Sequence, residues 1–359
     1  MTRPQPMASL DGIPDTKAQN SKPARRKPVD LVLSGGGVKG VGLVGAAVAV
    51  LDAGYTLKRV SGVSAGSLVG SILAAAANGN QLTTDQIKEI ALTLPYDKFR
   101  DSGPVGQLPL VGSAWGLLRE NGLYRGDFAH QWIRSELKNL GVTTFGDLAL
   151  TDRQISVERR YRLAVTVTDI TTGQLARLPW DYQRLYGLDP DEQFVADAVR
   201  ASMSIPFFFR PVTLTSNTGL TSTLVDGGVL SNFPIDTFDR PDCKPPRWPT
   251  FGITVVPELP GDNEQVIPGI GALRLLGPPS ILLEQLITTL IVGHDQTYLN
   301  QPWVKARAIR VDSTAVNFLD FGITRNDAEA LYDKGYAAAQ TFLSTWNWVE
   351  YLERYRQYQ

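Results

Sequence analysis

Residues 59–77 read RVSGVSAGSLVGSILAAAA and contain the pentapeptide GVSAG at residues 62–66. A short apolar run precedes Ser64 and small apolar residues follow it, so the pattern predicts a strand that turns sharply into a helix. G-x-S-x-G is the pattern of a nucleophile elbow, in which glycines make room for a strained turn that exposes the serine hydroxyl. The turn also brings backbone N–H groups, that of Ala65 among them, to a helix N-terminus, which favours an oxyanion.

A second glycine-rich segment precedes the elbow. Residues 29–33, VDLVL, predict a strand that leads into SGGGVKG at residues 34–40, and the small apolar residues that follow predict a helix ending at Gly54. The predicted order is therefore strand, glycine loop, helix, strand, elbow, helix. Such a βαβα start predicts an α/β fold of three layers, α/β/α, around a mostly parallel sheet.

The glycine loop has two interpretations. Its consecutive glycines leave the N–H groups of Gly36, Gly37 and Val38 unobstructed at the start of a helix, which suits an oxyanion hole. The same letters match G-x-G-x-x-G, but a dinucleotide site expects an acidic residue at the end of the second strand. That strand ends in SGVSAG, and Asp52 falls inside the first predicted helix. The oxyanion hole is the favoured interpretation.

A serine nucleophile needs a base, and the chain has only two histidines, His130 and His294. The order Ser64, Asp226, His294 would fit a hydrolase triad, but His294 falls within a predicted apolar helix rather than a loop. Asp226 follows an apolar strand and precedes two glycines, which predicts either a plain Asp-Gly-Gly turn or a base. A carboxylate acts as a base for serine only if it is desolvated and close to the hydroxyl.

Taken in order, these segments resemble the patatin-like phospholipase family. The resemblance rests on the glycine loop at residues 35–40, the elbow at 62–66 and Asp226 with its two glycines, and residues 201–207 (ASMSIPF) and 320–336 resemble two further blocks of that family. It covers about residues 29–343. It implies a modified α/β-hydrolase core, a Ser-Asp dyad without histidine, no metal or cofactor, and a lipid carboxyl ester as substrate. A non-catalytic lipid- or signal-binding protein of the same fold is the alternative from another class.

Position by position, the resemblance implies that Ser64 is the nucleophile and Asp226 the base. The oxyanion donors would be Gly36, Gly37 and Val38, with Ala65 contributed by the elbow. The motif glycines are Gly35, Gly40, Gly62, Gly66, Gly227 and Gly228. Lys39 stands where many relatives carry arginine, and it is the candidate for a contact with the head group, although lysine lacks the bidentate fork of arginine.

Composition narrows the class of protein. The chain has 359 residues with Lys+Arg 35 against Asp+Glu 36, and this balance argues against a nucleic-acid partner. Cys243 is the only cysteine, which excludes an intrachain disulfide and favours the cytoplasm. No apolar run reaches the roughly 18 residues of a membrane-spanning helix. We therefore expect at most peripheral contact with a membrane, and the sequence does not predict an oligomeric state.

We expect one domain. Residues 1–28 form a Pro-rich, basic leader that is predicted to be disordered, residues 29–240 form the catalytic core, and residues 241–359 add strands and helices that complete it. The apolar residues 104–118 and a predicted helix at 278–300 could line an acyl pocket or belong to the core. The aromatic tail after residue 345 could meet a lipid surface or pack onto the domain.

Overall fold

The computed structural model describes residues 27–79, 82–101, 124–240, 242, 244–255, 289–290, 295–314, 316 and 320–355. Almost all of the predicted leader lies outside the described residues. So do the segment at 104–118, most of the predicted helix at 278–300, Cys243 and His294.

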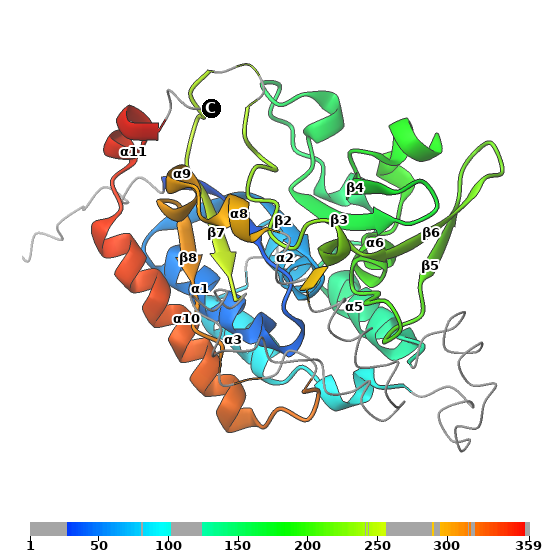
Figure 1. Cartoon of the computed structure of the whole chain (residues 1–359), viewed down its shortest axis with the longest axis horizontal. Helices are drawn as coiled ribbons and strands as arrows, with labels where there is room; N and C mark the ends of the chain where they lie inside the picture. Colours follow the sequence, from blue (N-terminus) through cyan, green and yellow to red (C-terminus); the bar gives the residue numbers. More distant parts are fainter. Residues whose placement is uncertain are drawn as a thin grey trace, which may run out of the picture.

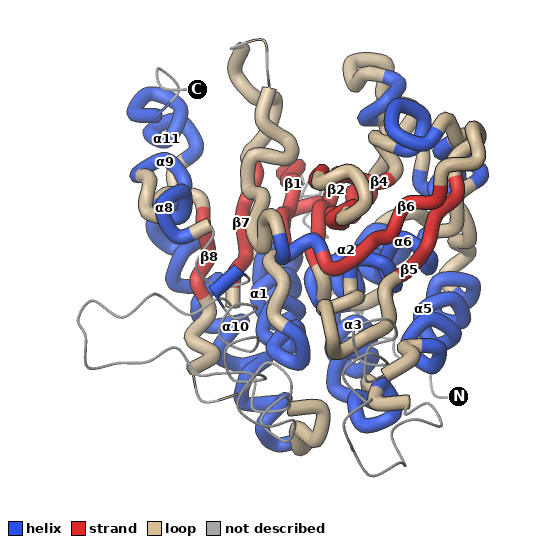
Figure 2. The backbone as a smooth tube through the Cα atoms, turned by 45° about the vertical axis from the view of Figure 1, so that its right-hand side comes forward, coloured by secondary structure: helices blue, strands red, loops and turns tan. Residues whose placement is uncertain are grey.

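The strands form one eight-stranded sheet in the order β5-β6-β3-β2-β1-β7-β8, with β4 paired to β3 off this path (Figure 2). The pairs β1/β2, β1/β7, β2/β3 and β7/β8 are parallel, and β3/β4, β3/β6 and β5/β6 are antiparallel. The sheet is therefore mixed, with a parallel centre. The strands are β1 Lys27–Leu33, β2 Tyr55–Val63, β3 Leu163–Asp169, β4 Gln174–Leu178, β5 Val212–Thr215, β6 Thr221–Asp226, β7 Thr250–Thr254 and β8 Ala308–Arg310.

One helix follows the glycine loop and another follows the elbow, as the sequence predicts, and Gly54 after α1 has a φ of 86°. A capping box between Thr83 and Gln86 begins α3. The helices are α1 Gly40–Asp52, α2 Ala65–Ala76, α3 Thr84–Leu92, α5 Asp127–Asn139, α6 Val195–Ser202, α8 Gln296–Leu299, α9 Pro302–Lys305, α10 Arg325–Thr345 and α11 Trp348–Tyr355.

The two faces of the sheet are covered unequally. Alternation along β1 sends Leu31 and Leu33 into the large core beneath α1 and α2, while Val32 joins a smaller core with Phe233 and Val304 on the other face. Because β1, α1, β2, α2 and β3 progress in one direction across the sheet, both crossover helices lie on one face. The expected three-layer α/β/α architecture is confirmed.

The closing helix α10 lies along α1 (Figure 1). The two helices approach closely because both carry glycine at the contact: a Cβ on Gly45 would overlap the Tyr332 carbonyl, and one on Gly335 would overlap the Gly42 carbonyl. At the end of α10, Trp346 packs edge-on against Phe251 of the sheet with ring centroids 4.9 Å apart. The described part of the aromatic tail thus begins by packing onto the domain.

Candidate active site

Ser64 stands at the turn between β2 and α2, as the elbow pattern predicts. Its φ of 51° and ψ of −125° are unusual for a residue with a side chain. The flanking glycines are required sterically, since a Cβ on Gly62 would overlap the Gly66 carbonyl and one on Gly66 would lie 2.5 Å from the carbonyl oxygens of Leu33 and Ser34. The turn therefore packs directly against the end of β1.

The strained turn is held by a residue that sequence reasoning missed. The Ser64 N–H donates to Ser202 Oγ at 2.8 Å, and Ser202 Oγ donates in turn to the Thr166 carbonyl of β3 at 2.7 Å. Ser202 ends α6 and is fully buried. The only signal in the sequence was its place in the ASMSIPF block, where nothing indicated which hydroxyl would reach the elbow, 138 residues earlier in the chain.

The glycine loop lies against the elbow. Gly37 has a φ of 57° and begins a short 3-10 turn that ends at Lys39. A Cβ on Gly35 would lie 3.2 Å from Ser64 Cβ, and one on Gly40 would lie 3.2 Å from Ala65 Cβ. Within the described residues, the N–H groups of Gly36, Gly37 and Val38 have no hydrogen-bond acceptor. The loop thus carries free N–H groups in the immediate surroundings of Ser64.

Sheet register brings Asp226 level with Ser64. Val63, the last residue of β2, pairs with Thr166, and Asp226, the last residue of β6, pairs with the next residue of β3, Val167. A Cβ on Gly227 would overlap the Thr166 carbonyl, so this glycine lets the turn after Asp226 press onto β3. Ser64 and Asp226, 162 positions apart in the chain, therefore lie on either side of the same strand, β3.

The Asp226 carboxyl is 2% exposed, and no cation forms an ion pair with it among the described residues. Its Oδ1 accepts a hydrogen bond from the Gly228 N–H at 2.8 Å. Burial raises the pKa of Asp226 to about 7, against the opposing effect of the Ser64 hydroxyl and the Gly228 N–H. Oδ2 has no hydrogen-bond partner within the described residues, although the Ser64 hydroxyl is near enough to lower the pKa of this carboxyl.

Asn232 is a second residue that sequence reasoning missed. Its carbonyl accepts from the Gly35 N–H at 3.0 Å, and its own N–H donates to Asp295 Oδ2 at 2.6 Å. Its buried side chain lies against Gly35 and Gly228, and a Cβ on either glycine would collide with it. Asn232 therefore joins the glycine loop to the turn after Asp226.

Lys39 is buried rather than extended into solvent. Burial lowers its pKa to about 8, and the nearby carboxylate of Asp312 opposes the shift. Asp312 also accepts a hydrogen bond from Lys334 Nζ at 2.9 Å. The structure thus places an acidic neighbour beside Lys39, which the sequence did not predict, and a head-group contact stays a prediction.

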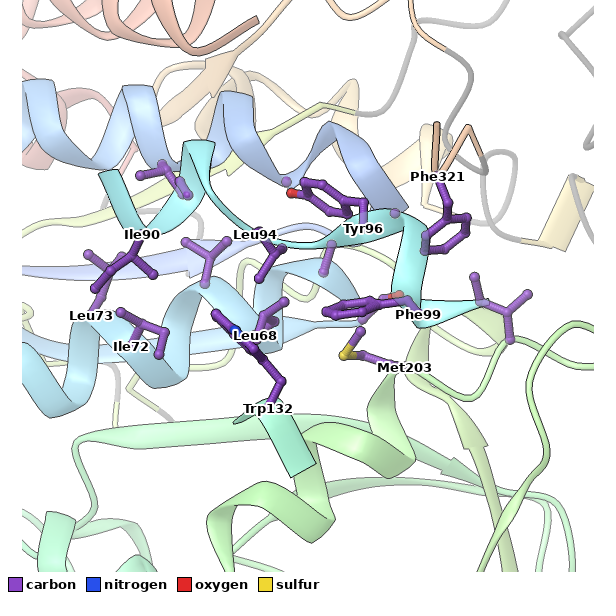
Figure 3. Close-up of a pocket in the computed structure, with 18 of the residues that line it drawn as sticks. Leu68, Ile72, Leu73, Ile90, Leu94, Tyr96, Phe99, Trp132, Met203 and Phe321 are labelled. Carbon is purple, nitrogen blue, oxygen red and sulfur yellow. The ribbon is translucent and has the colours of Figure 1, made fainter. Parts of the chain in front are cut away.

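An apolar pocket opens at Ser64. Its walls come from α1, α2, α3, α5 and the segment after α6, and Figure 3 shows Leu68, Phe99, Trp132 and Met203 around it. Of the two segments expected to line an acyl pocket, 104–118 lies entirely and 278–300 mostly outside the described residues, so that expectation stays a prediction. The pocket forms only because α3 and α5 pack over α2, and no local sequence pattern indicates this arrangement.

The two histidines give no evidence for a triad. His130 lies on α5, where its Nε2 is 2.7 Å from Asp197 Oδ1, and it does not line the pocket. His294 lies outside the described residues. In the described ranges no cluster of His, Cys, Asp and Glu could hold a metal ion. No helix in those ranges is long and apolar enough to cross a bilayer.

The chain is similar to several known proteins and matches one family model. YqhO of Bacillus subtilis (strain 168), an uncharacterized protein, is 34% identical over 323 residues, which cover 89% of this chain and 99% of that protein. Lysophospholipase NTE1 of Eremothecium gossypii is 26% identical over 60% of this chain but only 11% of its own length. The crystal structure of VipD from Legionella pneumophila superposes with a TM-score of 0.48 at 18% identity, covering 89% of this chain and 67% of that one. The family described as Patatin-like phospholipase matches residues 31–239, and the chain belongs to this family.

Proposed function

We propose that the protein is a serine hydrolase of phospholipase A or lysophospholipase type that cleaves carboxyl esters of lipids. Membership of the family supports lipid ester hydrolysis. The observation that carries the mechanism is the buried Asp226 carboxyl, with its pKa raised to about 7, beside the hydroxyl of the strained Ser64. A base with a pKa near the working pH is both ionised often enough and strong enough to take a proton.

In the proposed reaction, Asp226 takes the hydroxyl proton of Ser64 while Oγ attacks the ester carbonyl. The N–H groups of Gly36, Gly37, Val38 and Ala65 hold the developing oxyanion, and each such donor contributes roughly 100- to 1,000-fold to the rate. Asp226 then gives the proton to the leaving alcohol. Water, activated by the same carboxylate, releases the fatty acid from Ser64.

The apolar pocket would hold the acyl chain, because its walls offer almost only hydrocarbon to a substrate bound at Ser64. The polar head would then stay outside the pocket, and Lys39 of the glycine loop is the candidate contact. We propose the cytoplasm as the location, with peripheral contact to a membrane that supplies the lipid.

A fluorophosphonate probe tests the nucleophile. We expect the probe to label the wild type and Ser71→Ala but not Ser64→Ala, and fatty-acid release from lysophospholipid to follow the same pattern. Ser71 is a matched control because it is a buried serine of the same helix that does not line the pocket. Labelling of Ser64→Ala at the wild-type rate would refute the assignment.

Two further variants separate the dyad from a triad. His130→Ala and His294→Ala should each keep kcat/KM within about threefold of the wild type, since general-base catalysis would be worth roughly 100-fold or more. A collapse of activity in folded His294→Ala protein would replace the dyad by a Ser64, Asp226, His294 triad. A folded wild type that neither reacts with the probe nor hydrolyses any lipid would support the non-catalytic alternative.

A further inference from the structure

The pocket at Ser64 is elongated along α2. Figure 3 shows Phe321 and Met203 at one end and Leu73 and Ile90 at the other. Leu73 lies nine residues beyond Ser64 on a helix that begins at Ala65. At 1.5 Å per residue this is about 13 Å, roughly the length of an extended chain of ten carbons.

A second hollow lies beyond that far end. It lies between the end of α1, the start of β2, the end of α2 and the start of α3. Its lining is mostly apolar and includes Leu51, Leu57, Ala76 and Leu82. A hydrocarbon chain in it would meet mainly apolar side chains, with a few hydroxyl groups, that of Thr56 among them, as exceptions.

Two side chains line both spaces. Leu73 projects from α2 and Ile87 from α3, each is nearly fully buried, and both border the pocket at Ser64 and the second hollow. Neither side chain carries a polar atom, so the barrier between the spaces is only the thickness of two aliphatic side chains. We name these two residues the pocket wall.

We infer that the pocket wall sets the acyl-chain preference of the enzyme, and that the second hollow is a distal acyl site which longer chains reach once the wall is shortened. This inference rests on the proposed function, because it assumes an acyl chain attached at Ser64. A chain of about ten carbons ends at the wall, whereas a longer one must fold back or leave methylene groups in water, where they lose the gain from burial.

The first test compares p-nitrophenyl decanoate with p-nitrophenyl palmitate in the same detergent. We expect the ratio of kcat/KM for palmitate over decanoate to rise about tenfold or more in Leu73→Ala and, from the other side of the wall, in Ile87→Ala. Leu57→Ala is the matched control, because Leu57 is a buried leucine that lines only the second hollow. Its ratio should stay within about twofold of the wild type, with circular dichroism confirming that each variant is folded.

The second test asks where the longer chain goes. Ala77 is partly exposed at the end of α2 and lines the second hollow but not the pocket at Ser64. Adding Ala77→Phe to Leu73→Ala should fill the hollow and reverse the gain on palmitate while leaving decanoate hydrolysis unchanged. If the gain survives, the second hollow does not receive the chain and the inference is overturned.

Two other outcomes would also overturn the inference. Unchanged ratios in both wall variants, with decanoate still hydrolysed, would show that the wall does not set the preference. An equal rise in Leu57→Ala would show general loosening of the core and would overturn the inference as well. If the wild type hydrolyses neither ester, the proposed function itself fails, which is a distinguishable result.

Discussion

Two buried aspartates on the same sheet have opposite surroundings. Asp30 lies inside β1 opposite Arg59 of β2, whose guanidinium approaches its carboxylate to 2.5 Å. Asp226 ends β6, and among the residues that the structure describes its carboxyl has two neutral donors as neighbours, the Gly228 N–H and the Ser64 hydroxyl. Burial raises the pKa of both carboxyls, but Asp30 has a cation that opposes the rise. A buried aspartate paired with a cation has a structural role, whereas a buried aspartate without such a partner has a raised pKa that suits general-base catalysis.

The largest expected difference between the two aspartates is in activity. Asp226→Asn should lower kcat/KM for lysophospholipid by about 1,000-fold, because the amide cannot take the proton of Ser64. Asp30→Asn should change kcat/KM by less than about threefold per folded molecule, since Asp30 is remote from the pocket. Initial rates at pH 8, corrected for the folded fraction, measure both. An Asp226→Asn variant with a tenth of the wild-type activity would contradict the dyad.

Stability should show the reverse order. Arg59→Met is expected to cost about 3 kcal/mol of unfolding free energy, because it leaves the buried Asp30 carboxylate without its cation. Urea unfolding of the variant at pH 8 measures the loss. The double variant Asp30→Leu with Arg59→Met should recover a large part of it, since neither charge then remains. A double variant less stable than the single one would show that the pair contributes more than the cost of its own burial.

The pH dependence of stability sharpens the comparison further. The folded-state pKa of Asp226, about 7, is raised above its ordinary value of 3.8, so the folded protein binds this proton more tightly than the unfolded chain. Ionisation of Asp226 therefore destabilises the fold, and this effect is absent below about pH 4 and complete above about pH 7. The stability advantage of Asp226→Asn over the wild type should be about 3 kcal/mol larger at pH 8 than at pH 4.5. Urea unfolding at both pH values tests this, and a difference independent of pH would contradict it.

The smallest expected effect concerns the support of the elbow. Ser202→Ala removes the acceptor of the Ser64 N–H, and we expect kcat to fall about fivefold to tenfold with KM nearly unchanged, because one buried hydrogen bond is worth about 1 kcal/mol. The rate of fluorophosphonate labelling should fall in parallel. Ser71→Ala, whose hydroxyl donates only within α2, is the control. A rise in KM without a change in kcat would mean that Ser202 shapes the pocket rather than positioning Ser64.

Local signals predicted the parallel centre of the sheet and the elbow. Apolar runs predicted β1 and β2, and Gly62 could be interpreted without tertiary knowledge because a Cβ there would collide with the Gly66 carbonyl, four residues away. The walls of the pocket were not predictable in this way. Phe99 and Trp132 lie in sequence patterns that are typical of core residues. They line the pocket at Ser64 only because α5 and the segment before it pack over α2.

The sequence alone specifies the pair of glycine-rich turns that follow β1 and β2, since the positive φ of Gly37 and the collision that a Cβ on Gly62 would cause both arise within the turn itself. The candidate base and the backbone support of these turns come only from the tertiary structure. It sets Asp226 opposite Val167, buries it without a cation and so raises its pKa, and it carries Ser202 to the Ser64 N–H. Proton affinity and backbone support depend on desolvation and on partners distant in the chain, and these exist only once the sheet has formed.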